Sequence, residues 1–232
     1  MQYKAVIFDL DDTLFDRNAA QIKVVEVIAE RLPQISHGRS MERLIEAFME
    51  SDRLSFVDYQ AGAPSDGLRE RRSGYFLEIL GVKGDYVDII TEIYVRDYPT
   101  ANIPIDGAVP LVMEISKTYP VAVVSNGLPD VQYKKIEAIG LREVFACVVL
   151  SEEIGIRKPD SQIFCYTADL LHVQPSDCLY VGDSYINDIV GAKTAGMQAC
   201  WFNRESIESD NMNIQADFVI TNLIELNRIL GL

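Results

Sequence analysis

Two carboxylates stand two positions apart directly after an apolar run. Asp9 and Asp11 follow residues 5–8, whose side chains are those of a buried strand. In an extended chain, residues two apart point to the same side, so both carboxylates should face one pocket. Such a pair is costly unless a cation or a proton relieves the repulsion. The spacing therefore predicts a metal site or an acid/base pair.

A carboxylate needs no base to deprotonate it near neutral pH, so Asp9 is the candidate nucleophile toward phosphorus. Asp11 is the candidate general acid/base, since the neighbouring charge and partial burial favour its protonated form. An isolated Asp pair after a strand is more often a turn and a helix cap. The assignment therefore depends on the other chemical groups of the chain.

Three further segments supply such groups in chain order. Ser125 with the backbone amides of Asn126 and Gly127 forms a cradle for phosphate oxygens after a second apolar run. Lys158, at the start of a predicted helix, offers a compact positive charge to phosphate and nucleophile. Asp183 follows another apolar run and is a hard oxygen ligand for Mg²⁺.

Asp188, five residues after Asp183, can hold a metal-bound water or orient Lys158. Each segment alone reads as a turn or a solvated side chain. Together, at the ends of successive predicted strands, they favour one site, because ligands of open parallel sheets bind beyond the carboxyl ends of the strands.

The elements that must position these groups alternate between strand and helix from residue 105 onward. Further strands are predicted at residues 121–124, 147–150, 179–181, 199–202 and 218–220, and helices at about 130–139, from 160, and through 189–196. Asp130 is predicted to cap the first of these helices. The pattern predicts an α/β fold, a Rossmann-like parallel sheet with helices on both faces.

Residues 17–98 differ, because their apolar positions recur with helical spacing only. An all-helical domain at 17–98 is therefore predicted as an insertion after the first strand, and residues 1–16 and 99–232 as the core. Arg69, Arg71 and Arg72 in this insertion are interpreted as a solvated basic helix face, with binding of an anionic substrate as the alternative.

Composition excludes several classes of function. The chain has 232 residues and a formal net charge of −14, which should repel nucleic acid and anionic membranes. Its four cysteines form no close-spaced pair, so we expect reduced thiols. We find no signal peptide or membrane-spanning run and expect a cytoplasmic protein, monomeric or homodimeric.

With these motifs in view, the chain resembles the haloacid dehalogenase-like superfamily of phosphohydrolases along its whole length. Residues 9–13, Ser125-Asn126-Gly127, Lys158, and Gly182-Asp183 with Asn187-Asp188 match its four motifs. The resemblance implies Mg²⁺ bound by Asp9, the main-chain carbonyl of Asp11 and Asp183. It also implies an aspartyl-phosphate on Asp9, Asp11 as the proton shuttle, Thr13 as a support of the first loop, and residues 17–98 as a mobile helical cap.

Members that break carbon–halogen bonds lack an acid/base Asp two residues after the nucleophile, so Asp11 favours phosphate chemistry. We expect a Mg²⁺-dependent hydrolase of a small phosphorylated metabolite, either a nucleoside monophosphate or a sugar phosphate. Residues 140–159 resemble nucleotidase-like members that act on pyrimidine nucleoside monophosphates. The alternatives are a phosphomutase of the β-phosphoglucomutase type, a 2-haloacid dehalogenase and a non-catalytic binding protein.

Overall fold

A computed structural model describes residues 3–207 and 214–232 of the chain. Residues 1–2 and 208–213 of the expected core therefore lie outside the described residues. The chain divides into two compact units, one formed by Met1–Asp16 with Asn102–Leu232 and the other by Arg17–Ala101. We describe each unit by itself.

The first unit contains a parallel sheet in which the described strands have the order β3-β2-β1-β4-β5-β6. This is the strand order of doubly wound dinucleotide-binding folds, and the predicted α/β class is confirmed. The strands are β1 (Ala5–Phe8), β2 (Val121–Ser125), β3 (Cys147–Leu150), β4 (Cys178–Gly182), β5 (Gln198–Phe202) and β6 (Phe218–Ile220).

Strand β1 lies between β2 and β4, with Phe8 opposite Val123 on one side and Val181 on the other. All residues of these three strands are buried, as expected for strands covered on both faces. Their carboxyl ends therefore lie next to one another at one edge of the sheet.

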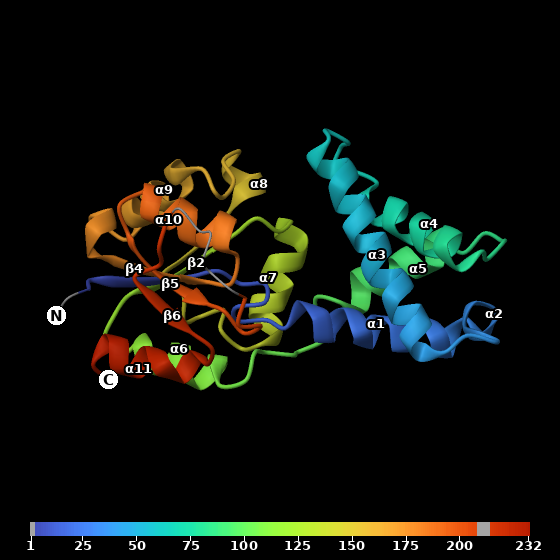
Figure 1. The fold of residues 1–232 in the computed structure, drawn as a ribbon, viewed down its shortest axis with the longest axis horizontal. Helices are drawn as coiled ribbons and strands as arrows, with labels where there is room; N and C mark the ends of the chain where they lie inside the picture. The colour runs from blue at the N-terminus through green and yellow to red at the C-terminus, as the bar shows by residue number, and fades with distance from the viewer. Residues whose placement is uncertain (1–2, 208–213) are drawn as a thin grey trace. The chain divides into compact units, whose positions relative to one another are not determined.

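Helices cover both faces of this sheet, and Figure 1 shows α9 and α10 on one face and α6 and α11 on the other. The described helices of the unit are α6 (Ala108–Ile115), α7 (Pro129–Ala138), α8 (Ser151–Ile154), α9 (Ser161–Leu170), α10 (Gly191–Thr194) and α11 (Leu226–Leu230). Short helical turns occupy η1 (Pro175–Asp177), η2 (Tyr185–Val190) and η3 (Leu223–Glu225).

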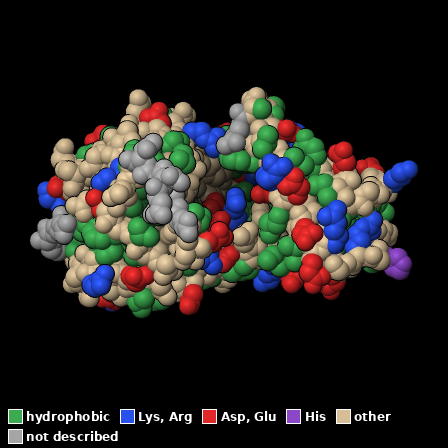
Figure 2. Space-filling model, in the orientation of Figure 1, with side chains coloured by type: hydrophobic (Ala, Val, Ile, Leu, Met, Phe, Trp, Pro, Cys, Tyr) green, Lys and Arg blue, Asp and Glu red, His purple; other side chains and the backbone are tan. Residues whose placement is uncertain are grey.

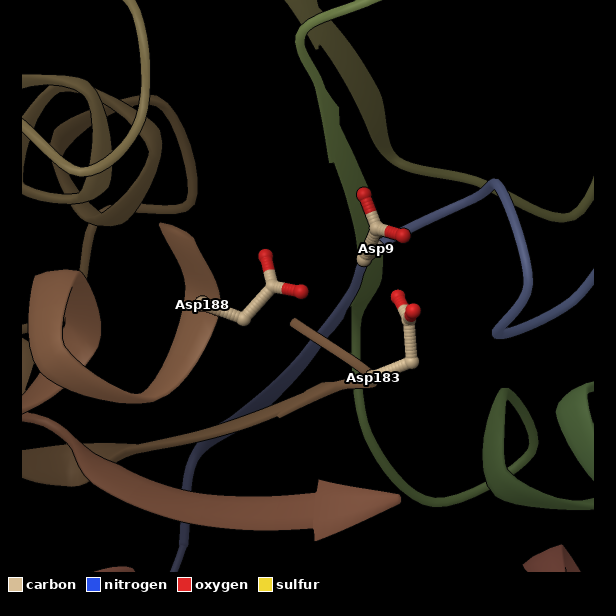
Figure 3. A group of neighbouring side chains, drawn as sticks. All are labelled: Asp9, Asp183 and Asp188. Carbon is tan, nitrogen blue, oxygen red and sulfur yellow. The ribbon is translucent and has the colours of Figure 1, made fainter. Parts of the chain in front are cut away.

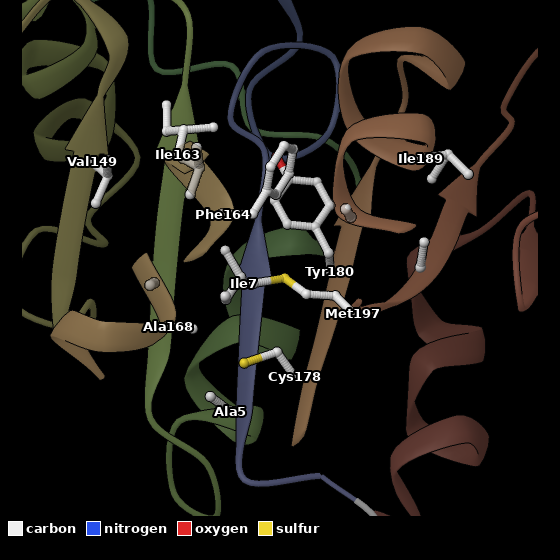
Figure 4. Packing of buried hydrophobic residues seen from close by; sticks show 14 of the residues in the cluster. Ala5, Ile7, Val149, Ile163, Phe164, Ala168, Cys178, Tyr180, Ile189 and Met197 are labelled. Carbon is white, nitrogen blue, oxygen red and sulfur yellow. The ribbon is translucent and has the colours of Figure 1, made fainter. Parts of the chain in front are cut away.

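Apolar side chains of α9 pack on the sheet beneath its carboxyl edge. The ring of Phe164 meets that of Tyr180 edge-on, with centroids 4.9 Å apart. Ile7, Met197 and Trp201 belong to the same buried cluster, part of which is drawn in Figure 4. The cluster supports β1 and β4 directly below the residues that leave the sheet.

One local prediction for this unit is wrong, and a second is confirmed with a different first turn. Leu128, not Asp130, occupies the N-cap of α7, because Pro129 takes the first helical position, where its fixed φ is favourable and its missing N–H costs nothing. The predicted helix through 189–196 begins as the wider turn η2, in which the N–H of Ile189 reaches back to the carbonyl of Ser184.

The second unit is helical, and its described residues form no strand. Its helices are α1 (Arg17–Arg31), α2 (Pro33–Ser36), α3 (Met41–Gln60), α4 (Leu68–Leu80) and α5 (Val87–Asp97). Phe48 of α3 is fully buried, and its ring meets that of Phe76 of α4 edge-on, with the ring centroids 5.5 Å apart. The unit thus has an aromatic core of its own.

Arg72 contradicts the interpretation of a solvated helix face. Its side chain is only 4% exposed, its guanidinium lies 3.2 Å from the ring centroid of Tyr94, and Nη1 donates to Asp52 at 3.2 Å. Arg71 donates to the carbonyl of Pro64 at 2.7 Å. Both arginines therefore hold the helical unit together.

Figure 2 shows acidic and basic side chains interspersed on the face drawn, with some basic side chains close together on the helical unit. No helix among the described residues combines the length and the apolar character that a membrane span requires.

The contact between Phe164 and Tyr180 makes a stability test. We expect Phe164→Ala to lower the free energy of unfolding by about 3–5 kcal/mol, because a fully buried ring is replaced by a cavity. Tyr166→Ala is the matched control, since Tyr166 lies on the same helix and is 42% exposed. Urea unfolding followed by the fluorescence of Trp201, the single tryptophan, reports on this unit. Equal losses for both variants would contradict the packing argument.

Candidate active site

Three carboxylates meet where β1 and β4 end. Asp9 follows β1, Asp183 follows β4, and Asp188 is in the turn η2 behind it. One oxygen from each lies within 4.8 Å of the others, and Figure 3 shows the three side chains converging. The parallel sheet thus brings Asp9 close to two carboxylates, Asp183 and Asp188, that lie far from it in the sequence.

A buried ammonium group compensates part of this negative charge. Lys158 is 3% exposed, and its Nζ donates to Asp9 at 2.5 Å and to Asp188 at 2.6 Å. It also lies 3.1 Å from the hydroxyl of Tyr180. Although burial opposes the charged form, the carboxylates of Asp188 and Asp9 raise the pKa of Lys158 well above its usual value. The ammonium is therefore held in its charged form beside Asp9.

Asn126 positions Lys158 through its main chain. The side-chain amide of Asn126 donates to the carbonyl of Lys158 at 3.0 Å, and its oxygen accepts from the N–H of the same residue at 2.9 Å. The sequence suggested only a backbone donor at this position. The side chain instead ties the loop after β2 to the segment that enters α9.

The carboxylate of Asp188 is bound by protein donors at both oxygens. Oδ1 accepts from Lys158 and from Tyr180, the latter at 3.0 Å, and Oδ2 accepts from the N–H of Ser184 at 2.9 Å. A Cβ on Gly182 would lie 2.5 Å from this carboxylate, so only glycine leaves room for it at the end of β4. These contacts are those of a residue that orients Lys158.

Thr13 lies between the two other carboxylates. Its hydroxyl is 3.4 Å from Asp9 Oδ2 and 3.4 Å from Asp183 Oδ1. The loop before it turns sharply at Asp12, which has a φ of 61°, in the left-handed region that Asp adopts more readily than most residues. The indole N–H of Trp201 donates to the carbonyl of Asp183 at 2.8 Å and holds the other loop.

Asp11 contacts residues that the sequence analysis did not single out. Lys135 Nζ lies 2.5 Å from Asp11 Oδ1, and Gln132 Nε2 donates to Oδ2 at 2.7 Å. Both belong to α7. The signal that could have revealed them is their spacing of three, which places both on the buried face of that helix beside Val131 and Ile136.

Ser125, the last residue of β2, accepts two hydrogen bonds at its hydroxyl oxygen. One comes from Gln132 Nε2 at 2.6 Å and the other from the N–H of Gly127 at 3.1 Å. Because both lone pairs are taken, the hydroxyl proton is left to donate. The arrangement suits an anion with acceptor oxygens.

Burial controls the protonation of the two carboxylates nearest the strand ends. Desolvation raises the pKa of Asp9 well above its usual value, against the opposing effect of Lys158. Burial, with the charges of Asp188 and Asp12, raises the pKa of Asp183 to about 7. A bound cation would remove this cost, since it neutralises both groups.

The donor set fits a magnesium ion. Asp9 and Asp183 present hard oxygen ligands, whereas Asp188 has its oxygens engaged by protein donors. Among the described residues, the three carboxylates share the ammonium group of Lys158, so their ionised forms leave an excess of negative charge at a buried position. Mg²⁺ is bound in this way, by one or two carboxylates together with waters and substrate phosphate.

Comparison with known proteins identifies the family. Residues 3–196 match the family model of haloacid dehalogenase-like hydrolases. The chain belongs to this family. Its Asp9 loop, Ser125, Lys158 and Asp183 are the residues on which the resemblance in the sequence rested.

Curated relatives agree with this assignment. The chain is 28% identical to pyrimidine 5'-nucleotidase YjjG of Escherichia coli, over 99% of both chains. It is 28% identical to a glyceraldehyde 3-phosphate phosphatase of Methanopyrus kandleri, over 96% of this chain and 95% of the relative. The chain is thus a phosphatase of the haloacid dehalogenase-like type.

Solved structures share the fold over the whole chain. The HAD-hydrolase YfnB of Bacillus subtilis, solved with bound magnesium, superposes with a TM-score of 0.83 at 25% identity and 100% coverage of both chains. The 2-haloacid dehalogenase of Pseudomonas syringae superposes with a TM-score of 0.67 at 30% identity, over 99% of this chain and 98% of that chain. The fold alone therefore does not separate these chemistries, and the side chains must.

The pKa of Asp183 makes a prediction for the metal-free protein. The folded state keeps its proton up to about pH 7, whereas the unfolded chain loses it near 4, so stability should fall as the pH rises between these values. Asp183→Asn should therefore raise the free energy of unfolding more at pH 8 than at pH 5. Urea unfolding in EDTA, followed by circular dichroism, measures this.

Asp169→Asn, on the exposed face of α9, is the matched control. If Asp183→Asn raises the free energy of unfolding equally at pH 5 and pH 8, or more at pH 5, the raised pKa of Asp183 does not control stability.

Proposed function

We propose that this protein is a Mg²⁺-dependent phosphomonoester hydrolase that works through an aspartyl-phosphate on Asp9. The observation that supports this most directly is the environment of Asp9. Its buried carboxylate is hydrogen-bonded to Lys158 at 2.5 Å and lies beside Asp183. A carboxylate approaches a phosphate dianion only when cations compensate the repulsion between them.

In the first step, a carboxylate oxygen of Asp9 attacks phosphorus. The new bond forms between this oxygen and phosphorus, while the bond from phosphorus to the leaving alkoxide breaks. Asp11 gives its proton to the departing oxygen. Lys158, the hydroxyl of Ser125 and the amides of Asn126 and Gly127 hold the phosphate oxygens.

In the second step, Asp11 takes a proton from water, and the resulting nucleophile attacks the phosphorus of the aspartyl-phosphate. The bond between phosphorus and Asp9 breaks, which restores the carboxylate and releases inorganic phosphate. Magnesium, held by Asp9, Asp183 and the main-chain carbonyl of Asp11, would supply charge neutralisation. Thr13 supports the Asp9 loop, and Asp188 keeps Lys158 directed at Asp9.

We propose a nucleoside monophosphate as the substrate class, with a sugar phosphate as the second candidate. Full-length similarity to a pyrimidine 5'-nucleotidase supports the first, and similarity to a triose phosphate phosphatase supports the second. We further propose that residues 17–98 act as a cap that selects the substrate. The compactness of the helical unit and the interdomain movement described for YfnB support this role.

Two of the three alternatives leave groups of this site unexplained. A dehalogenase has no use for a proton-transferring carboxylate at position 11. A non-catalytic binding protein would have no reason to keep Asp9, Asp11, Ser125, Lys158 and Asp183 together. A phosphomutase uses the same groups, so the fate of the phosphoryl group decides between mutase and hydrolase.

Replacing the nucleophile tests the mechanism. We expect Asp9→Asn to lose essentially all phosphate release from p-nitrophenyl phosphate, because an amide does not form the phosphoryl bond. Asp16→Asn is the matched control, since Asp16 ends the same loop and pairs with Arg204 at 3.2 Å. Circular dichroism should show both variants folded. Residual turnover above a few per cent in Asp9→Asn would rule out the assigned nucleophile.

A phosphate-release screen over common metabolites, with Mg²⁺ or with EDTA, tests the activity and the substrate class. Turnover should need the metal and should be fastest with a nucleoside monophosphate or a sugar phosphate. Interconversion of isomers without phosphate release would establish a mutase. Chloride release from a chloroacid in EDTA would establish a dehalogenase.

A further inference from the structure

Helix α7 carries two polar side chains on its buried face. Gln132 is fully buried and Lys135 is 2% exposed, whereas Lys134 between them faces solvent. A buried lysine is costly unless its charge is compensated. Neither residue belongs to the groups that the proposed mechanism uses, so their burial calls for a physical reason.

Both residues contact the carboxylate of Asp11. Lys135 Nζ binds Oδ1 at 2.5 Å and Gln132 Nε2 binds Oδ2 at 2.7 Å, so each oxygen has its own donor from α7. Two donors on separate oxygens define the plane of a carboxylate as well as its position. Lys135 also lies 5.0 Å from the ring centroid of Phe15, in the same loop as Asp11.

The amide of Gln132 joins Asp11 to the predicted phosphate cradle. Its Nε2 donates both to Asp11 and, at 2.6 Å, to the hydroxyl oxygen of Ser125. The ionised carboxylate of Asp11, the form that takes a proton from water in the second step, only accepts hydrogen bonds, so the nitrogen must face it. Within the described part of the chain, the oxygen Oε1 is buried and has no hydrogen-bond partner. The amide nitrogen thus donates to Asp11 and Ser125, and this orientation costs the amide oxygen its hydrogen bond.

Gly127 leaves space for this amide. A Cβ at Gly127 would lie 2.2 Å from Gln132 Nε2 and 2.4 Å from its Cδ. Any larger residue would push the amide away from Ser125 and Asp11. The glycine of the Ser-Asn-Gly segment and Gln132 are therefore matched to each other.

From these contacts we propose that Gln132 and Lys135 are positioning residues that hold the Asp11 carboxyl group in the orientation needed for proton transfer to the leaving group. Gln132 at the same time ties this orientation to the hydroxyl of Ser125. The inference rests on the proposed function, since it assumes that Asp11 is the proton donor. A purely structural role would affect all substrates alike, whereas a positioning role affects those that need the proton.

Two aryl phosphates of similar shape separate these roles. Phenyl phosphate releases a basic phenolate that benefits from protonation, whereas p-nitrophenyl phosphate releases a stable anion that does not. Lys135→Met should therefore lower kcat/KM on the order of 10²-fold for phenyl phosphate, as expected for a misplaced group, and much less for p-nitrophenyl phosphate. Lys134→Met, on the exposed side of α7, should leave both rates unchanged.

Asp11→Asn supplies the reference for the proposed function. It should lose about 10²–10⁴-fold on phenyl phosphate and clearly less on p-nitrophenyl phosphate. If this variant shows no such difference, the assignment of Asp11 as the acid fails. If Asp11→Asn shows the difference, the proposed function stands. The positioning role is then overturned if Lys135→Met loses activity equally on both substrates, or loses none on either.

Gln132→Met removes the second donor to Asp11 and leaves the Lys135–Asp11 pair in place, so it tests the same role independently. It should show the same preference for the better leaving group. This variant decides the question if Lys135→Met does not fold, as judged by circular dichroism. Equal losses on both substrates for a folded Gln132→Met would overturn the inference.

Discussion

The buried ammonium group of Lys158 is the interaction on which the site depends. It lies between the carboxylates of Asp9 and Asp188 in a region closed to solvent, where unpaired charges are not tolerated. Removing one partner of such a group typically costs about 3–5 kcal/mol, because the others stay buried and uncompensated. Asn126, Tyr180 and Ser184 all serve to keep this arrangement in place.

The remaining groups are organised by neighbouring elements in the same way. The three central strands end side by side, so Asp9, Ser125 and Asp183 leave the sheet at one edge. Helix α7 then adds two buried donors to Asp11, and one of them reaches Ser125 as well. The candidate nucleophile and the candidate acid are thus held by separate cations, Lys158 for Asp9 and Lys135 for Asp11.

The two units have separate cores. The sheet packs on the cluster around Phe164 and Tyr180, whereas the helical unit packs on Phe48, Phe76 and Tyr94. All candidate catalytic groups belong to the first unit. This division places the chemistry in one unit and leaves the other available for selecting what is hydrolysed, which is the role proposed for residues 17–98.

The sequence by itself determined the sheet, the helical insertion and the strand ends that carry Asp9, Ser125 and Asp183. Apolar runs and helical spacing are local patterns, and parallel strands expose their carboxyl ends at one edge. Only the tertiary structure decided that Gln132 and Lys135 bind Asp11, that Tyr180 joins Lys158, and that the Asn126 side chain holds the Lys158 backbone. These contacts join residues far apart in the chain through side-chain directions that a linear pattern does not encode.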